Sequence, residues 1–215
     1  MLEVKNLIMK YNNKVVLDNV NFHLDEGDVM AVAGENGSGK TTLITLLSTN
    51  KKRTSGEIDY SNEKNNYKVI KEKIGYIPQE IALFDELTVI DNFRIFGKIS
   101  NHEDFNFIKV IEVLELKDIL NSKISKLSGG TKRRVNIGVE LVRDPSFIFM
   151  DEPIVGIDYQ IRKKIVTLIN NLKDQGKIIV ISSHNLYFLK STCNKLLKLN
   201  DGKQEYFGEY NHEIL

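Results

Sequence analysis

Hydrophobic and polar positions alternate over the first 25 residues of the chain. Apolar side chains recur at every second position in residues 2–4, 15–17 and 20–24. A strand with one buried face has this period of two, so the pattern predicts antiparallel strands. Residues 29–33 are apolar at all five positions, which is typical of a central parallel strand covered on both faces.

Beyond residue 33, helical patterns alternate with further apolar runs. A helix is predicted to begin near Gly39 or Lys40. Residues ~80–145 are predicted to be mostly helical, with the spacing of a capping box at Ser100 and Glu103. The later predicted elements are a buried strand over residues 147–150, a helix capped by Asp158 and ended by Gly176, a buried strand over residues 178–181, and a hairpin over residues 196–207.

This order of elements predicts an α/β fold in a single domain. The length of 215 residues suits one domain. Alternating strands and helices favour a mixed, mostly parallel sheet with an antiparallel β part at the N-terminus and an inserted helical part. Ligands of such sheets bind at the carboxyl ends of the strands. Three polar clusters follow predicted strands, at residues 34–42, 151–152 and 184.

Composition and charge exclude several classes of protein. Hydrophobic residues make up 41% and charged residues 27% of the chain, which excludes a disordered protein. The 30 basic and 29 acidic residues leave a net charge of +1, so no overall field attracts nucleic acid. No apolar run approaches the ~18 residues of a membrane-spanning helix. The one cysteine, Cys193, excludes an internal disulfide.

The strongest motif is a phosphate loop of the pattern G-x-x-x-x-G-K-[ST]. It comprises Gly34, Glu35, Asn36, Gly37, Ser38, Gly39, Lys40, Thr41 and Thr42. Its glycines let backbone N–H groups surround phosphate oxygens, and the following helix directs its positive end at the anion. We expect Lys40 on the β- and γ-phosphates and the Thr41 hydroxyl on Mg²⁺. The alternative is an ordinary glycine-rich turn, which the apolar strand before it and the apolar helix after it disfavour.

A second motif places Asp151 and Glu152 directly after the apolar run of residues 147–150. A carboxylate at a strand end suits Mg²⁺, and this role is assigned to Asp151. Glu152 is expected to act as a general base that activates water for attack on the γ-phosphate. Alone, the pattern also fits an ordinary loop after a strand. Paired with a phosphate loop, it favours a catalytic site.

A third motif reads Leu-Ser-Gly-Gly-Thr over residues 127–131. Ser128 is a predicted N-cap, and Gly129 and Gly130 leave the helix N-terminus open to an anion. Alone, this is a plain capped helix start; with the first two motifs it predicts a second phosphate-binding segment. The basic residues 132–134 are predicted to form a solvated helix face, with contact to phosphate or to a partner's acidic side chains as the alternative.

The three motifs together resemble the ATP-binding subunit of ABC (ATP-binding cassette) transporters, and the resemblance covers essentially the whole chain. It implies a P-loop NTPase core from residues ~1–78 and ~145–215, with a helical signature subdomain over residues ~79–144 between them. It also implies ATP and Mg²⁺ as ligands.

The resemblance assigns further site residues. Tyr11 matches the aromatic residue that stacks on adenine, with an ordinary tyrosine on a strand face as the alternative. Gln79 matches the glutamine that contacts Mg²⁺ and the attacking water. His184 matches the histidine near the γ-phosphate, with a plain surface histidine as the alternative. Asp158 matches the loop that follows the Asp-Glu strand end.

The resemblance also implies partners. Two nucleotide-binding domains of this family pair head to tail, so each ATP lies between the phosphate loop of one and residues 128–130 of the other. A second copy of this chain, or a related chain, is therefore one expected partner. The other is a transmembrane permease subunit, which would hold the chain at the cytoplasmic face of the membrane; no nucleic-acid partner is expected.

Two segments, residues 78–97 and 128–134, look like those of separately encoded exporter ATPases. The end of the chain soon after the hairpin adds to this expectation of export, because importer ATPases often carry a regulatory domain there. Four apolar residues are candidates for the groove that receives a permease helix, with the core of the helical subdomain as the alternative. They are Ile81, Leu83, Phe84 and Leu87.

Two other classes of protein remain as alternatives. A non-transport ABC ATPase acting on ribosome or DNA complexes shares the motifs, but such proteins usually carry two cassettes or long coiled coils. A small GTPase or nucleotide kinase shares the phosphate loop, but this sequence holds no Asn-Lys-x-Asp segment for guanine.

Overall fold

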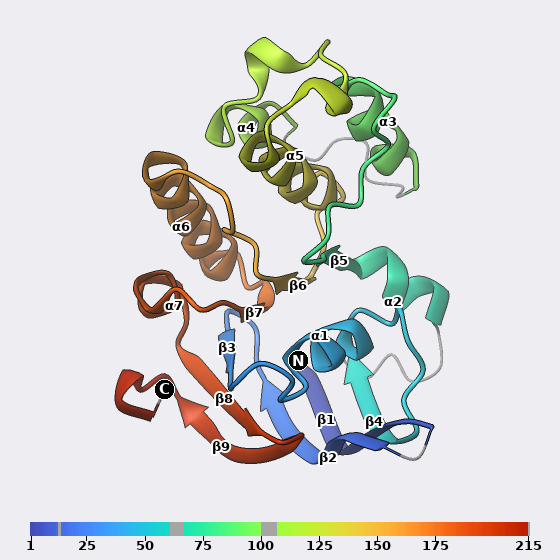
Figure 1. Ribbon diagram of the computed structural model, residues 1–215, viewed down its shortest axis with the longest axis vertical. Coiled ribbons are helices and arrows are strands. Elements are labelled where there is room, and N and C mark those ends of the chain that lie inside the picture. Colours follow the sequence, from blue (N-terminus) through green and yellow to red (C-terminus); the bar gives the residue numbers. More distant parts are fainter. Residues whose placement is uncertain (13, 61–66, 100–106, 215) are drawn as a thin grey trace.

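The computed structural model describes residues 1–12, 14–60, 67–99 and 107–214. The predicted capping pair Ser100 and Glu103 lies outside these residues. Nine strands form one sheet in the order β4-β1-β2-β9-β8-β3-β7-β6-β5. Helices cover both of its faces (Figure 1). The predicted α/β fold with a mixed sheet is therefore confirmed.

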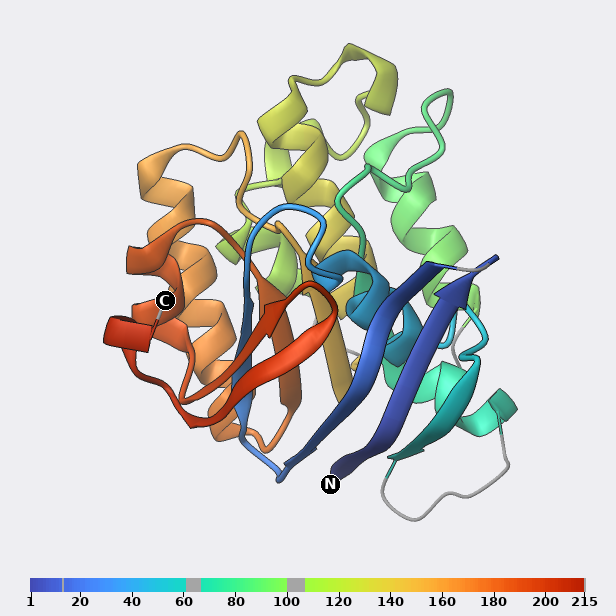
Figure 2. The ribbon, with the colours of Figure 1, turned by 60° about the horizontal axis from the view of Figure 1, so that its bottom comes forward.

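The N-terminal part of the sheet is antiparallel, as the alternating pattern predicts. Strand β1 (Leu2–Tyr11) lies between β2 (Lys14–Leu24) and β4 (Ser55–Tyr60). Val4 faces Phe22 on one side and Ile58 on the other. Figure 2 shows these three strands side by side.

The parallel part of the sheet contains the apolar strands. Strand β3 (Val29–Ala33) pairs with β7 (Ile178–Ser182). On the far side of β7 lies β6 (Phe147–Asp151), and β5 (Ile74–Ile77) pairs with β6 at the edge of the sheet. On its other side, β3 pairs with β8 (Lys195–Asn200), which forms the predicted hairpin with β9 (Lys203–Glu209). All five residues of β3, β6 and β7 are buried, as expected for strands covered on both faces.

One parallel pairing, Asp18 opposite Lys203, joins the antiparallel strands to the rest of the sheet. The backbone N–H of Asp18 also donates to the carbonyl oxygen of Gly202 at 2.8 Å. The antiparallel part is therefore continuous with the main sheet rather than a separate layer.

Two apolar clusters pack on the two faces of the sheet, because alternate residues of the buried strands point in opposite directions. Helix α1 (Lys40–Leu47) fills one face, where Leu43 and Leu47 join a cluster with Met30 of β3 and Phe149 of β6. The opposite cluster joins Ala31 and the other alternate strand residues to α6 (Tyr159–Asp174), α7 (Leu186–Thr192) and the helices of the inserted segment.

The inserted segment contains helices rather than strands in its described residues. Its helices are α3 (Val89–Ile99), α4 (Phe107–Val113) and α5 (Gly129–Leu141), with short 3-10 helices at Lys117–Ile119 and Ile124–Lys126. They lie together at one end of the molecule (Figure 1). A third 3-10 helix, His212–Ile214, follows β9. Within the described ranges, no helix has the length and apolarity needed to cross a membrane.

Residues 55–77 contain elements that the periodicity does not predict. They are β4, α2 (Tyr67–Lys73) and β5. Strand β4 carries Glu57 and Asp59 and has only one fully buried residue, because it is an edge strand. Strand β5 has four residues, which is too short for a periodic signal.

A buried carboxyl group joins α5 to β5. Glu140 accepts a hydrogen bond from the backbone N–H of Tyr76 at 3.2 Å and another from Nη1 of Arg143 at 3.2 Å. Arg143 in turn donates to the carbonyl oxygen of Lys71 at 3.0 Å. The last turn of α5 is thereby tied to the strand from which Gln79 emerges.

The burial of Glu140 makes this contact depend on pH. Burial raises the pKa of the Glu140 carboxyl above its usual 4.5, so its stabilising contribution is fully present below pH 4.5 and falls as the pH rises through the raised pKa. We expect the unfolding free energy of the wild type, relative to Glu140→Gln, to decrease as the pH rises from 4.5 towards neutrality. Urea unfolding over that pH range measures it; a constant or growing difference contradicts the assignment.

Candidate nucleotide-binding site

The phosphate loop connects β3 to α1, as predicted. Gly34 has a φ of +144°, and a Cβ there would overlap the carbonyl oxygen of Leu199. Only glycine fits at this point. Residues 35–37 at the crest of the loop are exposed, whereas Ser38 is buried and its Oγ has no hydrogen-bond partner among the described residues. The loop thus presents its crest to solvent while its base is packed against β8.

Lys40, the first residue of α1, folds back over the loop. Its Nζ donates to the carbonyl oxygens of Gly34 and Glu35, both at 2.8 Å. Burial lowers the pKa of Lys40, while the charges of Glu152 and Asp151 act in the opposite direction. The ammonium is therefore partly desolvated and within the electrostatic reach of both strand-end carboxylates.

Asp151 ends β6 and is held by the neighbouring strand. Its side chain is 2% exposed, and β6 pairs with β7 so that Asp151 lies opposite Ser182. The Ser182 hydroxyl donates to Oδ1 of Asp151, whereas Oδ2 is buried with no partner among the described residues. A buried carboxylate oxygen without a donor is costly unless a cation or a water occupies the space beside it.

Glu152 has a backbone conformation that is unusual for a residue with a side chain. Its φ is +48°, and its N–H donates to the carbonyl oxygen of Ser182 at 3.1 Å and to the Ser182 hydroxyl at 3.2 Å. Such strain costs about 1–3 kcal/mol and persists only where the surroundings impose it. The turn directs the carboxylate towards His184, whose Nε2 lies 3.5 Å from Oε1 of Glu152.

Gln79 leaves the sheet beside these carboxylates. Strand β5 ends at Ile77, which pairs with Met150 of β6, so Gln79 emerges next to the strand end of Asp151. The Gln79 residue is exposed, and its backbone carbonyl oxygen accepts a hydrogen bond from Nη2 of Arg133. The structure therefore brings Lys40, Gln79, Asp151, Glu152 and His184 to one edge of the sheet.

Arg133 is the residue that sequence reasoning misplaced. The sequence predicts a solvated helix face for residues 132–134, but Arg133 is 5% exposed, because its side of α5 packs on the segment after β5. The signal was available in the spacing, since Arg133, Asn136, Ile137 and Glu140 fall on one side of a helix. Its neighbours Lys132 and Arg134 are partly exposed.

Tyr11 lies at the end of β1, and its described contacts are with Lys51 rather than with the phosphate loop. The Lys51 ammonium lies 4.1 Å from the centre of the Tyr11 ring and donates to its hydroxyl at 2.7 Å. The ring is partly exposed. Stacking of this ring on adenine stays a prediction.

The signature residues begin α5 as predicted. Ser128 is the N-cap, and its Oγ accepts from the N–H of Thr131 at 3.3 Å. A Cβ added to Gly129 would meet open space, whereas one added to Gly130 would overlap the carbonyl oxygen of Gly156. Helix α5 lies with α3 and α4 at the helical end of the molecule, whereas α1 lies against the sheet (Figure 1).

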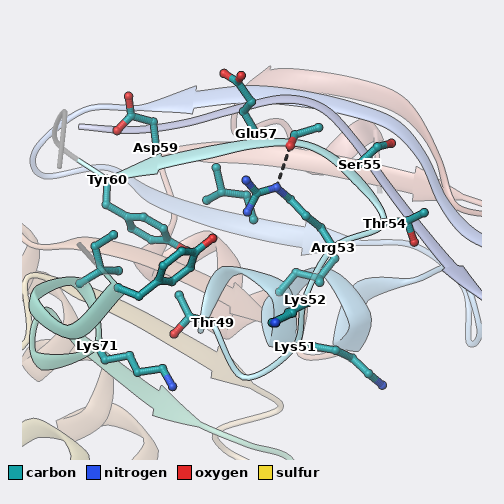
Figure 3. A pocket seen from close by; sticks show the side chains of 15 residues that line it. Thr49, Lys51, Lys52, Arg53, Thr54, Ser55, Glu57, Asp59, Tyr60 and Lys71 are labelled. Atoms are coloured by element: carbon teal, nitrogen blue, oxygen red, sulfur yellow. Dashed lines mark hydrogen bonds between the residues drawn. The ribbon is translucent and has the colours of Figure 1, made fainter. Parts of the chain in front are cut away.

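A pocket of the structure lies at the opposite end of α1 from the phosphate loop (Figure 3). Its lining includes Thr49, Arg53, Tyr60 and Lys71, from the segment after α1, β4 and α2. None of the residues predicted to bind nucleotide lines it. The predicted nucleotide site is instead the open edge formed by the strand ends.

A phosphate loop at a helix N-terminus, with two carboxylates at the carboxyl end of a strand at the same edge of the sheet, defines the class of phosphate-loop NTPases. A family model described as ABC transporter matches residues 17–155. The linearmycin resistance ATP-binding protein LnrL of Bacillus subtilis is 33% identical over 97% of this chain and 69% of its own length. The lantibiotic transport ATP-binding protein SrtF of Streptococcus pyogenes is 29% identical over 100% of this chain and 95% of its own.

Solved structures agree with these relatives. The structure of an ATP-binding subunit of an ABC transporter has a TM-score of 0.91 and 26% identity, over 97% of this chain and 90% of that chain. A dimeric ATP-binding cassette in a post-hydrolysis state, bound to ADP and Pi, has a TM-score of 0.88 and 26% identity, over 98% of this chain and 99% of that chain. The chain belongs to the ABC transporter family and is an ATP-binding subunit with ATPase activity.

The two signature glycines give a direct test of this local packing. Gly129→Ala is expected to leave stability unchanged or to raise it by up to about 1 kcal/mol, because alanine favours helix and the space is open. Gly130→Ala is expected to lower stability by about 1–3 kcal/mol, because its methyl group overlaps backbone. Chemical denaturation of both variants measures the difference, and equal stabilities would contradict this packing.

Proposed function

We propose that this ATPase binds MgATP with the phosphate loop and hydrolyses it with the two carboxylates at the carboxyl end of β6. The observation that carries the proposal is the parallel pairing of β3, β7 and β6, which brings the phosphate loop after β3 and the carboxylates after β6 to the same edge of the sheet. In this proposal residues 34–42 surround the phosphates and Lys40 neutralises the β- and γ-phosphates. The Tyr11 ring stacks on adenine, with Lys51 against the opposite face of the ring.

The residues at the strand ends fit a magnesium ion. Asp151 Oδ2 is a buried oxygen with no partner in the described structure, and hard cations of this kind prefer carboxylate, hydroxyl and amide oxygens. Thr41 and Gln79 supply the hydroxyl and the amide. When bound, the ion supplies charge neutralisation of the phosphate oxygens.

Glu152 is the proposed general base. Its turn holds the carboxylate close to His184, and its Oε1 makes no hydrogen bond in the described structure, so it is free to accept a proton from water. His184 is exposed and lies beside this carboxylate, and Gln79 is exposed where the chain leaves β5, the strand next to β6. We assign them to the γ-phosphate and to the attacking water.

The proposed functional unit is a pair of cassettes with Ser128–Gly130 of each on the nucleotide of the other. Two features support this arrangement. Ser128 and Gly129 face solvent with room beside Gly129, and apolar side chains are exposed close to the strand ends, where a partner would cover them. These side chains are Val155, Tyr159, Leu186 and Tyr187.

Two substitutions test catalysis and pairing together. Glu152→Gln is expected to keep ATP binding and to lower hydrolysis by at least about 100-fold, because the general base is lost. An ATP-dependent dimer should accumulate and elute earlier in size-exclusion chromatography. The double variant Glu152→Gln/Ser128→Arg should bind ATP as a monomer without dimerising, because the exposed position accepts the larger side chain only in the unpaired chain.

Either of two results would contradict these roles. Wild-type turnover by Glu152→Gln would show that another group is the base. An ATP-dependent dimer of the double variant would show that Ser128 does not face the partner's nucleotide.

A membrane subunit is the proposed partner for transport, and export is the proposed direction. The names of LnrL and SrtF refer to linearmycin resistance and lantibiotic transport, which supports an antimicrobial compound as the cargo. Ile81 and Phe84, from the segment after Gln79, are exposed apolar residues at which a permease helix would bind. Leu83 packs against the core and Leu87 is half-buried, so these two fit the alternative interpretation, the core of the helical part.

Affinity purification from detergent-solubilised membranes tests this partner. We expect a multi-helix membrane protein to co-purify in stoichiometric amount with the tagged chain. The paired substitution Ile81→Asp/Phe84→Asp should release it without loss of ATP binding, because a charged surface would replace the apolar one. Co-purification of ribosomal or DNA-bound proteins instead would contradict the transport proposal and leave the ATPase activity standing.

A further inference from the structure

One side of α5 holds the segment that carries Gln79. We call residues 78–85 the glutamine segment. Nη1 of Arg133 donates to the carbonyl oxygen of Pro78 at 2.6 Å, and Nη2 donates to that of Gln79. These are hydrogen bonds from an ionised donor, which are shorter and stronger than neutral ones.

Two further contacts bind the glutamine segment to the same helix. The backbone N–H of Ala82 donates to Oδ1 of Asn136 at 3.0 Å, and Asn136 is fully buried. Nζ of Lys132 lies 2.9 Å from Oδ1 of Asp85. The segment is therefore attached to α5 at its beginning, middle and end.

The same helix begins with the signature residues. Arg133 is five residues after Ser128, which is about 7.5 Å along a helix axis. An α-helix transmits a displacement over that distance as a rigid element. A movement of Ser128–Gly130 therefore reaches the glutamine segment through these contacts, and Arg133 is the side chain that bonds the Gln79 backbone directly.

We propose that Arg133 is a positioning residue that sets Gln79 through its backbone carbonyl and so links the two nucleotide sites of a cassette pair. When the signature residues of one chain bind the partner's nucleotide, the α5 helix of that chain moves. This movement shifts Gln79 of the same chain towards the nucleotide bound at its own phosphate loop. This inference rests on the proposed role of Gln79 in hydrolysis and adds the residue that controls it.

The electrostatic surroundings favour an arginine at this point. The charges of Asp151 and Glu152 act on the Arg133 guanidinium and favour its charged form, although burial lowers its pKa. The planar guanidinium of arginine directs two N–H donors at the carbonyl oxygens of the successive residues Pro78 and Gln79. The ammonium of lysine has no such fixed pair of donors. A lysine at this position would keep the positive charge but would lose the pair of hydrogen bonds to the backbone.

A double-mutant cycle tests the proposal by ATP hydrolysis. Arg133→Ala is expected to lower kcat by about 10- to 100-fold with a change in KM of less than about threefold, because misplacing a group by 1 Å costs about that much in rate. Arg133→Lys should recover part of the loss. In a Gln79→Ala background, Arg133→Ala should cause no further loss, because Arg133 acts only through Gln79.

Arg143→Ala is the matched control. Arg143 follows the end of α5, is also largely buried and also donates to a backbone carbonyl, but that of Lys71 in α2 rather than one of the glutamine segment. It should lower stability while leaving kcat near the wild-type value. Additive losses of kcat in the double variant Gln79→Ala/Arg133→Ala would overturn the proposal, as would an equal loss in Arg143→Ala.

Hydrogen exchange gives a readout that does not depend on activity. In nucleotide-free Arg133→Ala, the amides of Ala82 and Phe84, which donate to Asn136 and Asn92, should exchange at least about tenfold faster than in the wild type or in Arg143→Ala, since local opening exposes them. Unchanged exchange there would overturn the inference. Absence of hydrolysis by the wild type would instead count against the proposed function, so the two failures are distinguishable.

Discussion

The position of β6 between β5 and β7 is the constraint on which the rest of this structure depends. Parallel pairing aligns Ile77 with Met150 and Asp151 with Ser182, so the three chain segments that follow these strands leave the sheet at one edge. Residues separated by more than 70 positions in the sequence are thereby placed side by side. Because all of β6 and β7 is buried, the register is set by apolar packing, and a slip by one residue would turn Asp151 to the other face.

The two cations and two carboxylates at this edge of the sheet influence one another without forming direct ion pairs. Lys40 is bonded to backbone carbonyls of its own loop, Arg133 to those of the glutamine segment, and neither makes a direct ion pair with Asp151 or Glu152 in the described structure. Both cations nevertheless lie within electrostatic reach of the two carboxylates. A group held by neutral partners can turn to a phosphate without first breaking an ion pair.

Much of this site follows from the sequence because its residues occupy special positions in the backbone. The phosphate loop needs glycine at Gly34, the carboxylates end an apolar strand, and Ser128 caps a helix. Each leaves a local pattern. The pairing of β2 with β9 leaves none, because Asp18 meets Lys203 through a long-range contact. The spacing of Arg133 with Asn136 and Glu140 marks one side of a helix, but it does not reveal the carbonyl oxygens of Pro78 and Gln79 that the fold brings to Arg133. The division into core and helical parts at residues 79 and 144 likewise stays a prediction.

The hydrogen bonds of α5 show why that division is not a simple hinge between two independent parts. Glu140 holds β5 of the sheet, while Arg133 and Asn136 hold the segment that leaves it. The helix that begins with the signature residues is thus bonded along its length to the strand beside the catalytic carboxylate. If the signature end of α5 is displaced, the backbone must change its conformation in the few residues between Ile77 and Ala82. Strand β5 before them and helix α5 beside them are both tightly packed and resist deformation. Gln79 lies in the middle of that short connection, where a small displacement of the helix changes the site most.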